Sequence, residues 1–104
     1  MEDLTADNLQ EYLIDNKKVI VQYGATWCGA CKVMKPKLKK HSSENKDIVF
    51  LYADAEVHVK SRELTAIRNL PTFVGFVDGE IIAKAVGSKP DALNSLVEEI
   101  KKAS

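Results

Sequence analysis

Apolar residues divide the chain into strand-like runs and stretches with helical spacing. Runs rich in β-branched and aromatic side chains predict strands at 19–23, 48–53, 72–77 and 80–86. Apolar positions three and four residues apart predict helices at about 5–16, about 29–43, about 59–68 and from 88 onward. The first four residues leave room for a very short edge strand. This order predicts an α/β domain, with a central mixed β-sheet of four to five strands flanked by about four helices.

Local signals mark several element ends. Thr5 is the expected N-cap of the first helix, and Ser88 with Asp91 is interpreted as a capping box that starts the last one. Asp78-Gly79 between two apolar runs predicts a β-hairpin. The helix that connects the first two main strands predicts that these strands run parallel. The sheet should therefore be parallel in its middle and antiparallel towards its C-terminal strands.

The motif that carries chemistry is Trp27-Cys28-Gly29-Ala30-Cys31, which holds the only two cysteines and the only tryptophan. It lies where the strand at 19–23 passes into the helix at 29–43. Unpaired N–H groups and the positive dipole end of a helix start favour a thiolate, and the lysines that follow act in the same direction. Cys28 is therefore the better placed nucleophile, and Cys31, one turn later, can reach back to form a disulfide. A C-x-x-C pair at such a junction predicts redox chemistry.

Length and composition narrow the class of protein. With 104 residues, of which 45% are hydrophobic and 29% charged, the chain fits a single globular domain over 1–104. Fifteen basic residues balance fifteen acidic ones, so no net charge favours nucleic acid or a membrane surface. Neither a secretory signal nor an apolar run of transmembrane length is visible. A lone cysteine pair in such a chain predicts a reducing, cytoplasmic location.

Other interpretations of these residues compete with redox chemistry. The cysteines could be zinc ligands, but His41 and His58 do not have the spacing of a compact site with two cysteines and two histidines. We therefore predict no metal, expect both histidines to be surface or half-buried residues, and assign them no role. Trp27 could be plain core, although its position beside a turn favours a docking role. The lysines that follow Cys31 are interpreted as a solvated helix face with a modest effect on the choice of partner.

Three segments together resemble the thioredoxin family over nearly the whole chain. They are the cysteine motif within 25–32, the segment Leu70-Pro71-Thr72, and Val86-Gly87. The resemblance implies the thioredoxin fold, with a cis peptide bond before Pro71. It also implies that Cys28 attacks a substrate disulfide and that Cys31 resolves the resulting mixed disulfide. The implied substrate-docking surface consists of Trp27, Gly29, Ala30, Leu70, Pro71 and Gly87.

The resemblance further implies a protein disulfide reductase that needs no cofactor besides its reversible Cys28–Cys31 disulfide. Its partners would be protein disulfides and a reductase of the thioredoxin-reductase type that supplies electrons. The chain is expected to act as a monomer. Two alternatives stay open: a non-catalytic binding module that serves as a subunit of a larger enzyme, and a disulfide-introducing oxidant or isomerase.

Two positions depart from the family pattern. Thioredoxins usually hold a buried aspartate six residues before the first cysteine, which handles the proton of the resolving thiol. Gln22 stands there instead and neither accepts nor releases a proton near neutral pH, so slow proton transfer is expected. By position, Tyr52 replaces the charged residue that often accompanies that aspartate. Ala30 stands where thioredoxins carry proline, and its extra N–H, aimed at the Cys28 sulfur, predicts a pair about 20–30 mV less reducing.

Overall fold

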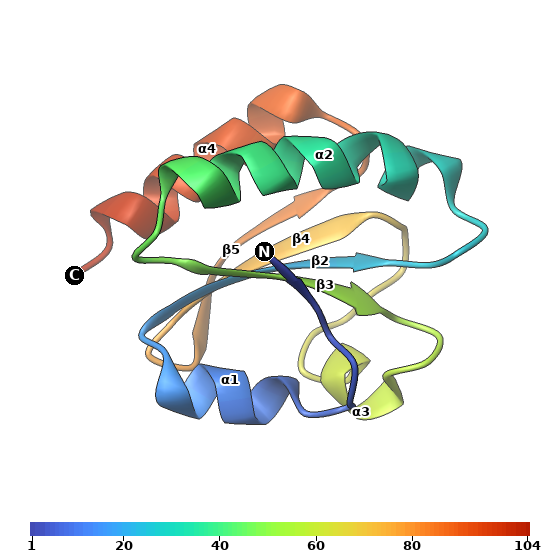
Figure 1. Cartoon of the computed structure of the whole chain (residues 1–104), viewed down its shortest axis with the longest axis horizontal. Helices are drawn as coiled ribbons and strands as arrows, with labels where there is room; N and C mark the ends of the chain where they lie inside the picture. The colour runs from blue at the N-terminus through green and yellow to red at the C-terminus, as the bar shows by residue number, and fades with distance from the viewer.

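The computed structural model describes all residues 1–104 and contains five strands and four helices (Figure 1). The strands are β1 (Glu2–Asp3), β2 (Lys18–Gly24), β3 (Val49–Asp54), β4 (Thr72–Val77) and β5 (Glu80–Val86). The helices are α1 (Leu9–Asp15), α2 (Gly29–Glu44), α3 (Val59–Arg62) and α4 (Pro90–Lys102). None of these helices combines the length and the apolar character that crossing a membrane requires. The expected α/β class is confirmed.

The strands form one mixed sheet with the order β1-β3-β2-β4-β5. Strand β3 lies parallel to both β1 and β2, whereas β4 is antiparallel to both β2 and β5. The expected parallel pair and the expected hairpin are therefore both present. Asp78 and Gly79 form the hairpin turn with φ angles of 52° and 81°, the left-handed conformation that short hairpin turns require.

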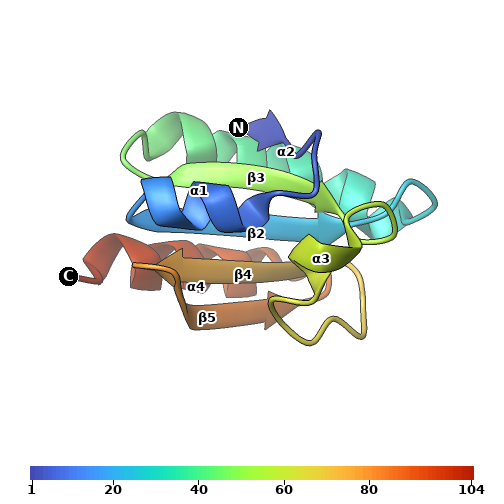
Figure 2. The same ribbon diagram turned by 90° about the horizontal axis from the view of Figure 1, so that it is seen from below.

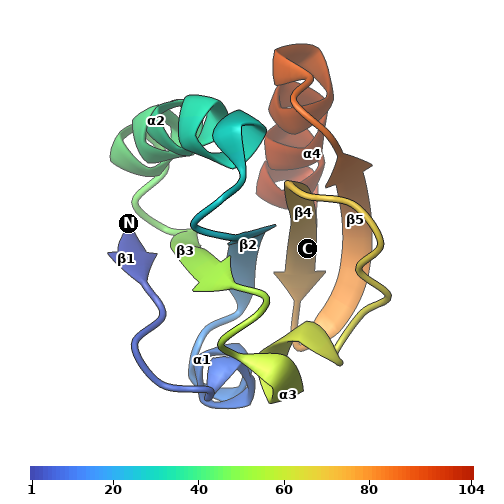
Figure 3. The ribbon, with the colours of Figure 1, turned by 90° about the vertical axis from the view of Figure 1, so that its right-hand side faces the viewer.

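Alternation along the central strand β2 builds a core on each face of the sheet. Val19, Val21 and Tyr23 pack on the face that α1 and α3 cover, which faces the viewer in Figure 2. Ile20 packs on the opposite face, beneath α2 and α4 (Figure 3). All four side chains are buried, and full burial of one aliphatic side chain stabilises the fold by roughly 1.5–3 kcal/mol. The two cores thus hold β2 rigidly, and β2 leads directly into the cysteine motif.

The first helix begins later than the sequence suggests, at Leu9 and without a cap from Thr5. A carboxylate just before it, that of Asp7, instead caps α3 by accepting the N–H groups of Lys60 at 2.9 Å and Ser61 at 2.7 Å. The Ser61 hydroxyl donates to the same carboxylate at 2.7 Å and accepts the Leu9 N–H at 3.3 Å. These bonds join the starts of two helices. They also lower the pKa of Asp7, chiefly through the Ser61 hydroxyl.

Helix α3 is shorter than predicted. It ends at Arg62 and does not continue to Arg68. The Arg62 side chain turns to donate a hydrogen bond to the carbonyl of Ile67 at 3.1 Å, within the irregular segment that follows. Ile67 is still buried in the core, so its spacing imitates that of a longer helix. The irregular segment brings the chain to Leu70-Pro71 at the start of β4.

The last helix begins at Pro90, with Lys89 as its N-cap and no capping bond from a side chain. The expected capping box of Ser88 and Asp91 is therefore wrong. Proline is favoured at the first helical position, since its fixed φ suits a helix start and its missing N–H would have no partner there. That preference places the N-cap one residue after Ser88. The apolar face of α4 is buried as predicted, through Leu93, Leu96, Val97 and Ile100.

Candidate active site

Strand β2 delivers the cysteine motif to the start of α2, at one end of the sheet. The backbone of Cys28 is extended, with φ −86° and ψ 104°, and its carbonyl accepts the N–H of Lys32 at 3.3 Å. Cys28 is therefore the N-cap of α2, and its Sγ accepts a hydrogen bond from the Cys31 N–H at 3.1 Å. The two cysteines form a disulfide, with their Cα atoms 5.3 Å apart. In the reduced protein a sulfur in this place is favoured as thiolate, because a helix-start N–H donates to it.

The two cysteines differ in their access to solvent. Cys28 is 5% exposed, whereas Cys31 is completely buried. Ala25 packs with both cysteines, and Ala30 and Leu70 lie against this small cluster. No carboxylate occurs in the first turn of α2, so no negative charge on the helix opposes a thiolate there. This arrangement favours Cys28 as the attacking sulfur and Cys31 as the resolving one.

The N–H that reaches the Cys28 sulfur belongs to Cys31, and not to Ala30 as the sequence led us to expect. An N-cap side chain accepts from the second or third residue after it, and here the third residue takes that place. Ala30 is the second residue and lies half-buried against the cysteine cluster. A proline at this position would leave the bond to the sulfur intact. The expected difference in reduction potential therefore loses its structural basis.

The segment before β4 and the residue after β5 meet beside the cysteines. The Leu70-Pro71 peptide bond is cis, and the Leu70 side chain packs against the cysteine cluster. The Pro71 carbonyl accepts the N–H of Gly87 at 2.8 Å. Gly87 has a φ of 89°, a backbone angle that residues other than glycine rarely adopt. The structure thus brings Leu70, Pro71 and Gly87 together with the cysteines at one end of the sheet.

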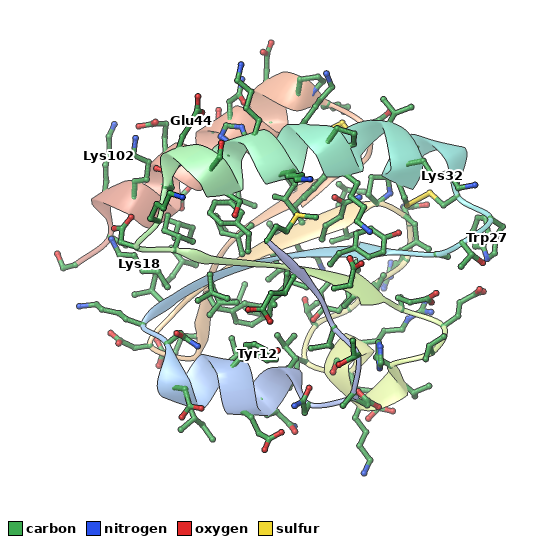
Figure 4. The ribbon with its side chains drawn as sticks, in the orientation of Figure 1. Tyr12, Lys18, Trp27, Lys32, Glu44 and Lys102 are labelled. Atoms are coloured by element: carbon green, nitrogen blue, oxygen red, sulfur yellow. A yellow bond between two sulfur atoms is a disulfide. The ribbon has the colours of Figure 1, made fainter.

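Trp27 projects into solvent at this end of the molecule, as Figure 4 shows, and 67% of its surface is exposed. Its indole N–H donates a 2.7 Å hydrogen bond to the carboxylate of Glu56, in the loop after β3. Asp54 shapes that loop by accepting the N–H groups of Glu56 at 2.9 Å and Val57 at 3.3 Å. Gly29, the first residue of α2, is exposed next to the motif. No local signal in the sequence marks Glu56, because only the fold brings it to the tryptophan.

Gln22 lies completely buried on β2, beneath the start of α2. Its side-chain amide donates to the carbonyl of Cys31 at 3.0 Å. Its Oε1 is the only buried side-chain nitrogen or oxygen atom without a hydrogen-bond partner in the protein. Burial of an unpaired carbonyl oxygen is unfavourable, which sets this position apart from an ordinary core amide. Gln22 therefore holds the backbone carbonyl of the resolving cysteine. Its own side-chain oxygen, which has no hydrogen-bond donor, points into the same buried region.

Tyr52 pairs with Gln22 in register across β3 and β2, but its hydroxyl does not satisfy the free Gln22 oxygen. A cation packs on this tyrosine instead: the Lys35 ammonium lies 4.3 Å from the ring centre. The same ammonium forms an ion pair of 2.8 Å with Asp3 on β1. Burial, followed by the negative charges of Asp54 and Asp3, raises the pKa of Tyr52. Tyr52 thus supplies no charge to the position where the family pattern has one.

The two histidines have hydrogen-bond partners away from the cysteines. His41 pairs with the Asn94 side chain at 2.8 Å, between α2 and α4. His58 is buried, contrary to the expected surface or half-buried position, and donates from Nε2 to the carbonyl of Leu4 at 2.8 Å. No three residues of the metal-binding types come together anywhere in the structure. The zinc interpretation therefore gains no support from the placement of either histidine.

Comparison with known proteins gives a consistent answer over the whole chain. A family model described as Thioredoxin matches residues 1–101. A thioredoxin of Coprinus comatus is 36% identical over 95 residues, which cover 89% of this chain and 90% of that protein. Thioredoxin-3, mitochondrial, of Saccharomyces cerevisiae is 32% identical over 96 residues, which cover 89% of this chain and 76% of that protein.

Solved structures agree with these sequence relatives. The Plasmodium falciparum thioredoxin superimposes with a TM-score of 0.89 at 28% identity, covering 99% of this chain and 100% of that one. The oxidised mitochondrial thioredoxin 3 of Saccharomyces cerevisiae superimposes with a TM-score of 0.83 at 33% identity, covering 99% and 95% of the two chains. With a cysteine pair at the start of α2 and a matching fold over its full length, this chain belongs to the thioredoxin family.

Proposed function

We propose that this protein works as a general reductase of protein disulfides in the cytoplasm, with electrons supplied by a reductase of the thioredoxin-reductase type. Its family membership makes it a dithiol–disulfide oxidoreductase that acts on protein disulfides and needs no bound cofactor. The observation that supports the assignment of roles most strongly is Cys28 at the N-cap of α2, with the Cys31 N–H directed at its sulfur.

In the reduced protein the Cys28 thiolate attacks one sulfur of the substrate disulfide. A mixed disulfide forms, and the other substrate sulfur leaves as a thiolate and takes up a proton. Cys31 then loses its proton, and its sulfur attacks Cys28 to form the disulfide within the protein. The second substrate sulfur is released and protonated in turn. The substrate gains two electrons from the two cysteines and two protons, one released by Cys31 and one taken from solvent, which received the Cys28 proton when the thiolate formed.

The proposed docking surface for the substrate backbone combines the cysteine motif with two loops beside it, at 70–71 and at Gly87. It consists of Trp27, Gly29, Ala30, Leu70, Pro71 and Gly87. An extended peptide could lie across it because β4 begins here beside an apolar surface, an arrangement that suits strand-like recognition. The hydrogen bond from Gly87 to the Pro71 carbonyl keeps the two loops in a fixed relation. The exposed Trp27 ring, held by Glu56, forms the outer wall of this surface.

The proposal includes a monomer and a cytoplasmic location. A reductase works where cellular thiol systems keep its cysteines reduced, which is the condition of the cytosol. The chain of 11.5 kDa should elute as a single copy in size-exclusion chromatography with light scattering. Antibody detection in fractionated source cells checks the compartment. A stable dimer, or recovery mainly from an organelle or the medium, would contradict these two points.

The experiment for the function is insulin reduction with dithiothreitol as the electron source. The protein should accelerate the precipitation of the insulin B chain catalytically, whereas a pure binding module would give no turnover. Equilibration with glutathione buffers then fixes the direction. A reductase should have a potential near the value of about −270 mV known for thioredoxin, and a value near the −120 mV or so of DsbA would make this protein an oxidant.

A further inference from the structure

The outer face of α2 carries an unusual concentration of positive charge. Five lysines occur along it before the first acidic residue, Glu44: Lys32, Lys35, Lys37, Lys39 and Lys40. Only Lys35 forms an ion pair, with Asp3, and the other four are exposed and make no hydrogen bond from their side chains. The formal net charge of the whole chain is zero. One third of the fifteen basic residues thus lie on one helix that carries a single acidic residue, and we call these five lysines the lysine face.

The lysine face adjoins the redox centre. Lys32 follows Cys31 directly, and Figure 4 shows Lys32 beside the disulfide at the end of the molecule where Trp27 projects. From Lys32 the face extends along α2 to Lys40, a distance of about 12 Å at the helical rise per residue. An open hollow of about 560 Å³ runs along its side, lined by Met1, Asp3, Lys32, Lys35, Pro36 and Lys39. About four residues of an extended chain would span this length.

The lysine face is unfavourable for the isolated helix. Lys32 and Lys35 are three residues apart, and Lys35 and Lys39 are four apart, which places like charges side by side on the helix. Cations also oppose the dipole at the N-terminal end of a helix, and the first turn of α2 contains no acidic residue to balance them. Within the chain only Asp3 relieves this repulsion. Carboxylates supplied from outside would relieve the rest.

We propose that the lysine face docks an acidic segment of the protein substrate, next to the disulfide that Cys28 attacks. This inference rests on the proposed reductase function and adds a class of preferred substrate to it. The place of the face favours a protein substrate as the occupant, because a protein whose disulfide reacts at Cys28 must lie next to Lys32 at the start of α2. The zero net charge of the chain gives no general attraction for nucleic acid.

Docking of this kind acts mainly on the rate of encounter. Complementary charge steers association and can raise its rate by factors of about 10 to 10³, and salt removes the gain. Lysines at the far end of the lysine face allow docking to be tested separately from the chemistry of the sulfur atoms. Lys39 lies eight residues after Cys31, about 12 Å along the helix, which exceeds the Debye length of about 8 Å at physiological salt. At physiological salt its charge therefore has little influence on the cysteine thiolates, and at low salt any influence is shared by all peptides and cancels in the ratio of their rates.

The test uses three peptides that share one intramolecular disulfide and differ only in the flanking residues, which are glutamates, serines or lysines. The measured quantity is the second-order rate constant for reduction by the pre-reduced protein. At low salt the glutamate peptide should react about tenfold faster than the serine peptide, and the lysine peptide more slowly than both. At about 1 M salt, where the Debye length falls to about 3 Å, the three rates should converge.

Charge-reversed variants locate the effect. In the Lys39→Glu/Lys40→Glu variant the rate ratio between the glutamate and serine peptides should fall to one or below. The matched control, Lys17→Glu/Lys102→Glu, changes the net charge equally, but Lys102 lies at the opposite end of the molecule from Trp27 (Figure 4), and its ratio should match the wild type. Circular dichroism verifies that both variants fold.

Four results would overturn the inference. Equal rates for all three peptides, at low salt and with the serine peptide reduced normally, would leave the reductase function intact and remove the docking role. An equal loss of preference in the Lys17→Glu/Lys102→Glu control would assign the effect to net charge. Binding of a short DNA duplex that the Lys39→Glu/Lys40→Glu variant loses, without any peptide preference, would assign the face to nucleic acid. A wild-type protein that reduces none of the peptides contradicts the reductase function itself, and this inference with it.

Discussion

Replacement of Gln22 by aspartate tests how the proton of the resolving cysteine is handled. Gln22 is completely buried, and its Oε1 faces no donor, so an aspartate there would have no cation or hydrogen-bond donor prepared for its charge. Tyr52, the register partner, donates no hydrogen bond to this position. Burial alone disfavours the charged form of a carboxyl group. The pKa of the new carboxyl group should therefore rise well above its usual value.

The size of the effect follows from burial. Complete burial raises a carboxyl pKa by up to 3–5 units, and a rise of about three units from about 3.9 brings it near 7 at a cost of about 4 kcal/mol. The sign follows from linkage. The cost is absent below the unfolded-state pKa of about 4, grows as the pH rises towards the folded-state pKa, and is complete above it. Gln22→Asp should therefore lose stability between acidic and neutral pH. A group with a pKa near neutrality also transfers protons well, so the resolving step should accelerate roughly tenfold or more.

Gln22→Asn is the matched control, because it has the shape of aspartate without the ionisation. Single-turnover reduction of a disulfide peptide is followed against pH for both variants, and urea unfolding is measured at acidic and at neutral pH. Only Gln22→Asp should show an added ionisation in the rate profile and a pH-dependent loss of stability. Identical rate profiles for the two variants would refute the reasoning, since another group would then already carry the proton.

Three further predictions address the remaining features. Iodoacetamide near neutral pH should label Cys28 in the reduced protein much faster than Cys31, as peptide mass spectrometry can measure; preferential labelling of Cys31 would reverse the assigned roles. Ala30→Pro should shift the potential in glutathione buffers by less than about 20 mV, because the N–H bonded to the Cys28 sulfur is retained; a larger shift would show that Ala30 contributes after all. Asp7→Asn should lower the free energy of unfolding near neutral pH, and the loss should shrink as the pH falls below the usual carboxyl pKa of 3.8, because the bonds at α3 depress the pKa of Asp7 and stabilise the fold only while it is ionised; a loss independent of pH would contradict this.

The sheet and the position of the redox pair could be predicted because their signals are local. The apolar runs at β2, β3 and β4 are each bounded by polar or turn residues, and the Cys28–Cys31 spacing lies directly at the end of one of them. A helix connects β2 to β3, and this connection makes the two strands parallel. The N-cap position of Cys28 likewise results from a short-range rule, because the residue before a helix start is its cap.

The features that escaped prediction depend on contacts between distant parts of the chain. Asp7 caps α3 from 53 residues away. Ser61, which is bonded to Asp7, accepts the Leu9 N–H at the start of α1, and local propensity at Thr5 does not reveal this contact. Glu56 reaches Trp27 only because β3 and β2 end side by side. The unpaired oxygen of Gln22 likewise appears only after α2 is placed above the sheet.

The central claim is that Cys28 attacks the substrate and Cys31 releases it, and trapping of the intermediate tests this most directly. The Cys31→Ser and Cys28→Ser variants are incubated with insulin, and the products are mapped by mass spectrometry after non-reducing electrophoresis. The account predicts a persistent mixed disulfide between insulin and Cys28 in Cys31→Ser, and no adduct or turnover in Cys28→Ser. An adduct through Cys31 in the Cys28→Ser variant, formed as readily as the other, would contradict it.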